Sequence, residues 1–328
     1  TTTQTNIGLD FGLFKQKLTG SVDYYIKKTE DILVLPPYLG VIGEGGNRWV
    51  NGASMENEGW EVTLGYSDET SFGLKYDISA NVSANKNKIT ALPDEVKNNY
   101  GGNGVDDNIL GRPINSMYGY VADGLFKNQD EVDNSANQDG KGLGRIRYQD
   151  LNGDGTITDK DRTWIGNPNP GLLFGFNLNL SYKNFDFTTF WEGANNVDVI
   201  NNTKYQTDFW SVDDVGSNKG TRLLNAWSVD NPNSTIPALT TVDRNAESRF
   251  STYYVENGNY LKLRVLQLGY SLPKDLLKKA NIDSFRFYIS GQNLLIIDAK
   301  NFTGVDPENA GFGYPQPMTF TAGLNFTL

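Results

Sequence analysis

Residues 172–191 read LLFGFNLNLSYKNFDFTTFW and decide the fold class of this chain. Every second position from Leu172 to Tyr182 is apolar or aromatic, and the positions between are mostly glycine, asparagine or serine. After a turn at Asn184, the segment from Phe185 to Trp191 shows apolar and polar positions again. A period of two places the apolar side chains on one face of a strand, so this stretch predicts an antiparallel hairpin with one oily and one polar face.

The same alternation recurs in seven other segments, which gives nine long strands in all. They lie at residues 7–13, 18–26, 60–66, 72–84, 259–272, 285–289 and 318–326. In the segment 259–272 the apolar parity slips after Val265, which predicts a β-bulge. About 11 residues at ~3.3 Å each, tilted near 40°, rise roughly 28 Å, close to the ~25 Å apolar band of an outer-membrane barrel.

Short and long connections alternate along the chain. Short turns are predicted near residues 16, 69, 184 and 277, and long loops at about 30–55, 87–169, 194–258 and 298–316. This asymmetry is typical of a transmembrane β-barrel, with long loops outside the cell and short turns in the periplasm. The C-terminus is then periplasmic. The alternative, a soluble sandwich or propeller with its loops at one end, fits the alternation but not the strand lengths or the aromatic faces.

Composition supports an all-β architecture and excludes several function classes. Aromatic residues make up 12% of the 328 residues, and 35 glycines accompany them. The formal charge of -10 disfavours a nucleic-acid partner, which normally needs a basic surface. The chain has no cysteine and no histidine, so it can form neither a disulfide, a thiolate zinc site nor a histidine general base.

The stretch IRYQDLNGDGTITDKDRTWIGNPNP, residues 146–170, carries an EF-hand/dockerin-like calcium motif. Gly155 stands at the sixth loop position and a carboxylate closes the loop at the twelfth, as a Ca²⁺ loop requires. Hard oxygen donors suit Ca²⁺. The predicted ligands are Asp150, Asn152, Asp154, Thr156 (through its carbonyl), Thr158 and Asp161. A structural ion would hold the long extracellular loop 86–170 in one conformation; the alternative is an Asn-Gly and Asp-Gly turn cluster without metal.

Large aromatic side chains in the predicted extracellular loops are candidate contacts for a substrate or a lid protein. Flat rings can stack on sugars or pack on a partner, although such residues also form local cores. The candidates are Trp49, Trp210, Trp227 and Tyr254. Acidic residues are numerous enough for a glycosidase-like pair, but the spacing singles out no two of them. We therefore predict a protein that is not an enzyme.

Several long motifs together resemble a known family. They are GRPINSMYGYVADGLF (111–126), the calcium stretch with its trailing IGNPNP, GFNLNLSYKNFDF (175–187), NGNYLKLRVLQLGYSLP (257–273) and FRFYISGQNLL (285–295). In this order they resemble the C-terminal part of SusC/RagA-type TonB-dependent transporters of Bacteroidota. The resemblance covers nearly the whole chain.

The resemblance implies an outer-membrane barrel of 22 strands with an N-terminal plug and a TonB box. It also implies a SusD-like surface lipoprotein as a lid, and import of a bulky glycan or peptide. Neither plug nor TonB box has a counterpart in these 328 residues. A nine-stranded open sheet would leave two unpaired edges in lipid, so we expect the remaining strands and plug to come from a longer chain or another chain. The alternative is a secreted or surface calcium-dependent β-rich glycan-binding module.

Overall fold

The computed structural model describes residues 1–35, 49–97, 104–208, 219–240, 243–278, 282–311 and 313–327. Strands dominate these residues, and the predicted all-β class is confirmed. Among the residues described, no helix is long and apolar enough to cross a membrane.

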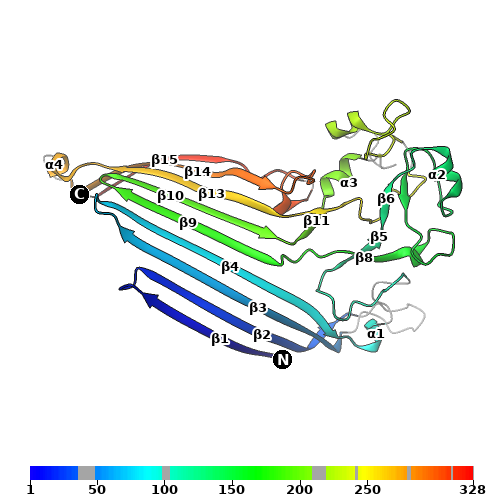
Figure 1. Cartoon of the computed structure of the whole chain (residues 1–328), viewed down its shortest axis with the longest axis horizontal. Helices are drawn as coiled ribbons and strands as arrows, with labels where there is room; N and C mark the ends of the chain where they lie inside the picture. Colours follow the sequence, from blue (N-terminus) through cyan, green and yellow to red (C-terminus); the bar gives the residue numbers. More distant parts are fainter. Residues whose placement is uncertain are drawn as a thin grey trace.

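Nine strands form one large antiparallel sheet, as the alternation predicts (Figure 1). Its order is β1-β2-β3-β4-β9-β10-β13-β14-β15, so each strand pairs with the next long strand along the chain. The strands are β1 (Thr2–Leu13), β2 (Leu18–Val34), β3 (Val50–Glu69), β4 (Leu74–Ala91), β9 (Leu172–Tyr182), β10 (Phe185–Asn195), β13 (Tyr260–Ser271), β14 (Ser284–Asp298) and β15 (Thr319–Thr327).

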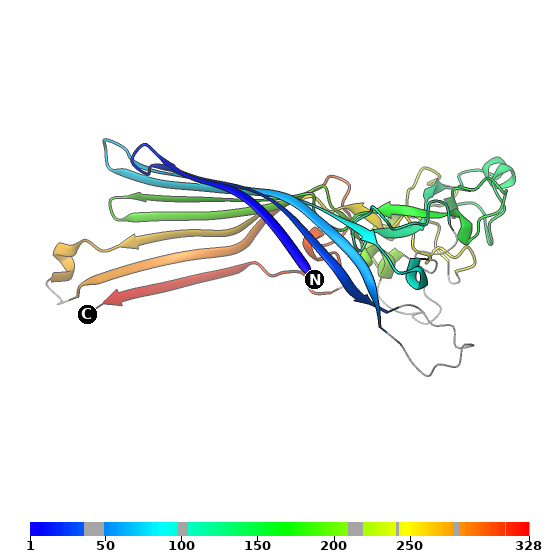
Figure 2. The same cartoon turned by 90° about the horizontal axis from the view of Figure 1, so that it is seen from below.

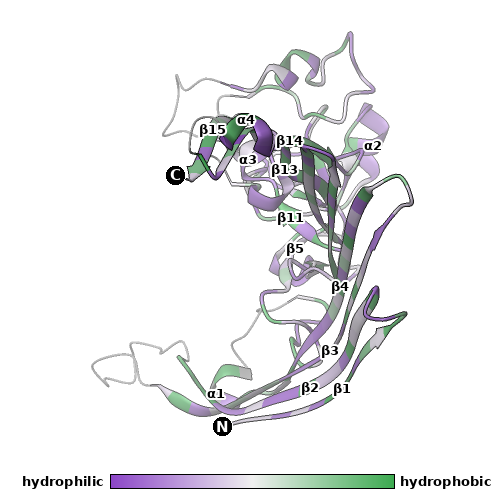
Figure 3. Cartoon of the chain, turned by 90° about the vertical axis from the view of Figure 1, so that its left-hand side faces the viewer, coloured by the Kyte–Doolittle hydropathy of each residue, from purple (hydrophilic) through white to green (hydrophobic). Residues whose placement is uncertain are grey.

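The sheet is strongly curved and does not close on itself. Seen along the strands it forms an open arc, with β1 near one end and β15 near the other (Figure 3). The turned view shows the same sheet as a bent wall, with most of the small elements gathered at one end and α4 (Lys274–Leu277) at the other (Figure 2). Within the described part of the chain, β1 and β15 are the two edge strands.

The two ends of the sheet differ as predicted, but the long loops are shorter than the sequence indicated. Strand β2 continues to Val34 and β3 begins at Val50, so the predicted excursion 30–55 is partly strand. Strand β4 likewise reaches Ala91, inside the predicted loop 86–170. The alternation is broken there because register shifts interrupt the β2–β3 pairing near Ile32 and the β3–β4 pairing near Ser54. Strand pairing continues past such a shift, but the apolar alternation in the sequence changes phase there, so the end of the strand is not visible in the sequence.

The predicted bulge in β13 is confirmed. The pairing of β13 with β14 shifts register between Leu263 and Val265, and the pairing with β10 shifts opposite the same residues. Relative to β10, Arg264 is the extra residue, because Val265 and Leu263 pair with the adjacent Phe190 and Trp191. A bulge adds one residue to one strand, so the outward-facing set changes from odd-numbered to even-numbered positions.

A layer of short elements covers the end of the sheet where the long connections meet (Figure 1). Three two-stranded sheets pair β5 with β8, β6 with β7, and β11 with β12. The short strands are β5 (Met117–Tyr120), β6 (Ala122–Leu125), β7 (Ile146–Tyr148), β8 (Arg162–Gly166), β11 (Asp198–Ile200) and β12 (Val255–Asn257). The helical segments are α1 (Asp94–Lys97), α2 (Gln129–Asn134), η2 (Asp159–Asp161), α3 (Asn202–Asp208), η3 (Thr221–Asn225) and η5 (Pro307–Asn309) here, with α4 (Lys274–Leu277) at the opposite end.

Candidate functional site

One face of the large sheet is apolar across all nine strands. Residues opposite each other in neighbouring strands share a face, so the register defines rows of side chains. One row runs Leu180, Phe187, Leu268 and Ile289 across four strands, and another runs Tyr66, Ile78 and Leu178. Many of these large apolar side chains are exposed, including Ile7, Leu9, Phe185, Phe320 and Phe326. A protein in water rarely exposes so large a continuous apolar face.

The opposite face is polar. Glu61 pairs with Asp23 and Ser83, and Asp77 pairs with Asn179. On this face Asn179 donates to Asp77 at 3.2 Å and accepts from Thr188 at 3.0 Å. A polar groove of about 510 Å³ follows the first strands between Asp23, Glu61 and their neighbours. The sheet therefore separates an apolar surface from a wettable one.

A network of charges fixes the last long loop against the polar face. Lys262 of β13 is only 3% exposed, and its Nζ lies 2.8 Å from both carboxylate oxygens of Asp306. Arg264, the bulge residue, donates from one nitrogen to both oxygens of Glu308 at 2.6 Å and also binds Glu192. Burial raises the pKa of Glu308, but hydrogen bonds from Lys262 and Arg264 outweigh it and hold that pKa below its usual value. The β14–β15 loop is thus anchored to the wall.

The predicted calcium loop has the backbone turn that its motif requires. Asp150 accepts hydrogen bonds from the N–H groups of Gly153 at 2.8 Å and Gly155 at 2.7 Å. Gly155 has a φ of 82°, which glycine adopts without strain. These N–H groups favour the ionised form, so the pKa of Asp150 lies below its usual value. Asp154 accepts from the N–H of Thr156, and Asn152 donates to Asp154.

Asp161 closes this loop from the inside. Its side chain is 0% exposed, and its two oxygens accept from the N–H groups of Leu151 at 2.9 Å and Thr158 at 2.7 Å. Thr158 caps η2 in a capping box with Asp161. The described residues hold no group of three acidic side chains placed together as metal ligands. The donors nevertheless fit Ca²⁺ in chemistry, because each carboxylate keeps further lone pairs. Calcium here stays a prediction.

The four aromatic candidates do not gather into one contact surface. Trp49 is 62% exposed beside β3, and Trp210 lies outside the described residues. Tyr254 is 1% exposed and donates its hydroxyl to the carbonyl of Glu247 at 2.7 Å, and Trp227 packs against the loop core. For Tyr254 the core alternative is therefore the correct one, since its ring is buried inside the layer, whereas Trp227 is half-buried on that core and stays a candidate. Of the three candidates that the structure describes, Trp49 alone has a large exposed area.

The core of the loop layer is rich in tyrosine. Tyr120, Leu125, Ile146 and Tyr148 form its centre, although they come from three different short strands. The Arg249 guanidinium lies 4.7 Å from the ring centre of Tyr120 and 4.8 Å from that of Tyr148. Burial raises the pKa of the Tyr120 phenol to about 12, so it remains a hydrogen-bond donor, here to Asp159 at 2.7 Å.

A buried polar network ties two distant loops together in this layer. Glu247 accepts from the N–H of Ile146 at 2.9 Å and from Arg145 at 2.8 Å. Asn245 and Gln138, both buried, bond to each other and to the carbonyl of Ile146. Burial raises the pKa of Glu247. Sequence reasoning missed this network because its partners stand about 100 positions apart, and nothing local marks them.

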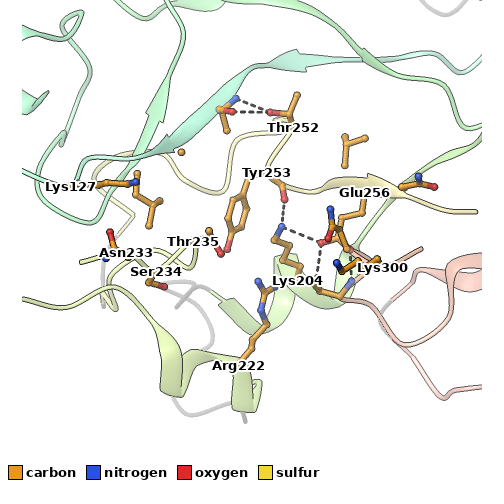
Figure 4. Close-up of a pocket in the computed structure, with 17 residues that line it drawn as sticks. Lys127, Lys204, Arg222, Asn233, Ser234, Thr235, Thr252, Tyr253, Glu256 and Lys300 are labelled. Carbon is orange, nitrogen blue, oxygen red and sulfur yellow. Dashed lines mark hydrogen bonds and ion pairs between the residues drawn. The ribbon is translucent and has the colours of Figure 1, made fainter. Parts of the chain in front are cut away.

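A cavity of about 800 Å³ opens beside this core (Figure 4). Its walls come from the ends of β6 and β12, from α3 and η3, and from the loop after β14. Lys204 crosses it, donating to the carbonyl of Tyr253 and lying 3.3 Å from Glu256. Burial lowers the pKa of Lys204, while bonds from Thr303, Lys204 and Asn201 hold the pKa of Glu256 below its usual value against the effect of burial.

Comparison with known proteins finds relatives that match nearly the whole chain, although no family model matches it. It is 32% identical over 99% of its length to TonB-dependent receptor P3 of Formosa agariphila, of which it covers 34%. It is 30% identical over 99% of its length to TonB-dependent receptor SusC of Bacteroides thetaiotaomicron, covering 31%. A solved structure of the RagAB peptide transporter superimposes on the whole chain with a TM-score of 0.79 at 26% identity.

The chain is homologous to the barrel of SusC/RagA-type TonB-dependent receptors. It spans about one third of the length of these relatives, which agrees with the nine strands and the two open edges. The resemblance predicted from the sequence motifs is confirmed.

Proposed function

We propose that this chain is part of the wall of an outer-membrane transporter that imports a bulky nutrient without chemical change to it. One observation carries the proposal: rows of apolar side chains cross the whole sheet on one face while polar side chains line the other. Lipid solvates the first face and a water-filled lumen the second. The outer membrane of a Gram-negative bacterium of the Bacteroidota is the location that the relatives support.

The open edges β1 and β15 support completion by further strands. Unsatisfied backbone groups in lipid cost several kcal/mol each, so an open sheet cannot persist in a membrane. The remaining strands of a 22-stranded barrel, with a plug and a TonB box, would pair with these edges. TonB would then supply the energy for import through the plug.

The loop layer supports an extracellular role. The long connections gather at one end and the short turns at the other (Figure 1), and this asymmetry supports a periplasmic position for the C-terminal end of β15. A SusD-like lipoprotein would cover the loop end as a lid. The substrate is a glycan or a peptide, and the exposed Trp49 is one ring available for a lid or substrate contact.

The test uses the full-length protein that contains this chain. We expect it to fractionate with the outer membrane, to require detergent for extraction, and to copurify with a surface lipoprotein. Deleting TonB should abolish uptake of the nutrient while binding to cells persists. A chain that stays soluble and monodisperse without detergent would contradict the barrel and favour the calcium-dependent glycan-binding module.

Calcium at the Asp150 loop is a second part of the proposal. The turn geometry and the oxygen donors of Asp150, Asp154 and the Thr156 carbonyl support it. Chelation should increase proteolysis within residues 92–171 while the sheet stays intact. At a free Ca²⁺ concentration of 100 times Kd, the ion would stabilise the loop by about 2.7 kcal/mol. Global unfolding on chelation would contradict this local role.

A further inference from the structure

The cavity in the loop layer is positively charged although the chain as a whole is acidic. Among the residues that the structure describes, four cations line it and one acid, Glu256, does so. The cations are Lys127, Lys204, Arg222 and Lys300. The whole chain has 29 basic and 39 acidic residues, so the local balance is opposite in sign to the average. A concave site of one charge sign attracts ligands of the other.

The four cations differ in how far the protein already neutralises them. Lys204 pairs with Glu256, and Arg222 lies 3.1 Å from Asp208. Lys127 and Lys300 have no acidic group within 4.0 Å of their ammonium nitrogens in the described part of the chain, and both are exposed. They lie on opposite sides of the Tyr253 ring in the close-up (Figure 4). Two cations are therefore accessible to an anionic ligand.

Glu256, the acidic residue of the cavity lining, already accepts hydrogen bonds from other residues of the chain. Glu256 accepts from the hydroxyl of Thr303 at 2.7 Å, from its N–H at 2.8 Å and from the Asn201 amide at 2.9 Å. A carboxylate held by three donors and a lysine repels an anion less than a free one would. The accessible charge of the cavity is thus the positive charge of Lys127 and Lys300.

The rest of the lining is mostly uncharged and polar. Amide and hydroxyl side chains are the most numerous, and they stand beside the ring of Tyr253 and the apolar Ala122, Leu125 and Val255. The polar set is Asn233, Ser234, Thr235, Thr252, Asn257, Asn301 and Thr303. Such groups both donate and accept hydrogen bonds, which suits a ligand rich in hydroxyl groups.

We propose that this cavity binds an acidic oligosaccharide, with Lys127 and Lys300 contacting its carboxylates and the amide and hydroxyl side chains contacting its hydroxyl groups. A volume of about 800 Å³ lies within the range of about 300–1,000 Å³ that is usual for small-ligand sites. The identification of this ligand as the imported nutrient rests on the proposed function; its binding to the cavity does not.

The test is a titration of the purified full-length protein in detergent with trigalacturonic acid, maltotriose and a triglutamate peptide. Trigalacturonic acid should bind, more weakly as salt is added, and maltotriose should bind at least about tenfold more weakly. The variant K127Q/K300Q should lose about tenfold or more in affinity for trigalacturonic acid. The matched control Lys278→Gln, at the opposite end of the sheet and 77% exposed, should change nothing.

Three results would overturn this inference: unchanged affinity in K127Q/K300Q, equal binding of maltotriose, or no binding of trigalacturonic acid. Stronger binding of the triglutamate peptide, lost in the same variant, would replace the saccharide by an acidic peptide and so overturn the ligand class. TonB-dependent uptake of a different nutrient without trigalacturonate binding would refute this inference alone. Binding that depends on both lysines, in a protein without any uptake, would support the site and refute the proposed function.

Discussion

The large sheet and the loop layer are stabilised in different ways. The sheet forms continuous backbone ladders between neighbours in the chain, and its apolar side chains remain exposed. The loop layer has strands of three to five residues and a small core in which tyrosines, an arginine stack and a buried acid combine. The sheet therefore needs lipid on one face, whereas the layer has its own buried interior.

This difference teaches where a mutation will act. Removing a buried polar partner should destabilise the loop layer without changing the sheet, because the layer depends on a few long-range contacts. Placing a charge on the apolar face should weaken insertion of the sheet into the membrane without changing the loop layer, because only that face contacts hydrocarbon. The predictions below test this separation.

The largest effect is expected for Glu247→Ala. Glu247 is buried with Arg145 and accepts the N–H of Ile146, so its removal leaves a cation and a backbone donor without their partner. Breaking a buried ion pair from one side costs about 3–5 kcal/mol. Hydrogen exchange of the full-length protein should show faster exchange in residues 117–166 and an unchanged sheet. As control, Asp275→Ala, at a side chain 96% exposed in α4, should change exchange in neither region. Faster exchange in the sheet of Glu247→Ala would contradict the independence of the two regions.

Two adjacent residues of β4 test the membrane face next. Ile78 pairs with Tyr66 and Leu178 on the apolar face, whereas Ser79 pairs with Gly65 and Asn177 on the polar face. An arginine facing lipid near mid-depth costs about 2–4 kcal/mol, and one facing the lumen costs little. The free energy of unfolding from lipid vesicles, measured by urea titration, should therefore be lower for Ile78→Arg than for the unchanged protein. For Ser79→Arg it should stay the same. Equal destabilisation by the two substitutions would contradict the assignment of the Ile78 face to lipid and the Ser79 face to the lumen.

How far the sequence predicts each region follows from the range of the interactions. A period of two is readable along a single strand, so the nine strands and the β13 bulge could be predicted. The ends of β2 and β3 could not, because register shifts near Ile32 hide the alternation there. The loop core joins residues such as Ala122 and Thr252, 130 positions apart, and no local pattern encodes that pairing.

The candidate site divides in the same way. The Asp150 loop is a local motif, and its turn is found where the spacing predicts it. The cavity with Lys127 and Lys300 could not be predicted, since its walls come from segments between residues 122 and 303. Aromatic residues in loops were predicted as contacts or as cores, and for Tyr254 only burial decides between these. Burial is a property of the assembled layer.

A smaller effect is expected for Tyr254→Phe. The Tyr254 hydroxyl donates to the carbonyl of Glu247 at 2.7 Å, while its ring packs 5.2 Å from those of Tyr205 and Tyr253. The substitution keeps the ring contacts and removes one hydrogen bond, which costs about 0.5–1.5 kcal/mol. The thermal stability of the loop layer should fall slightly. Tyr314→Phe, at a residue 97% exposed, is the matched control and should show no change; a larger effect there would mean that burial does not decide the cost.

The smallest effect concerns acid pH at the Asp150 loop. The N–H groups of Gly155 and Gly153 hold the pKa of Asp150 below its usual value. A carboxyl with a lowered folded-state pKa stabilises the loop above its unfolded pKa of about 3.9, and this contribution is lost as pH falls through the lower folded value. In chelator, exchange at Gly153 and Gly155, corrected for intrinsic rates, should thus accelerate below about pH 4. Asp150→Asn should remove this pH step, whereas a step of equal size in the variant would assign it to another group.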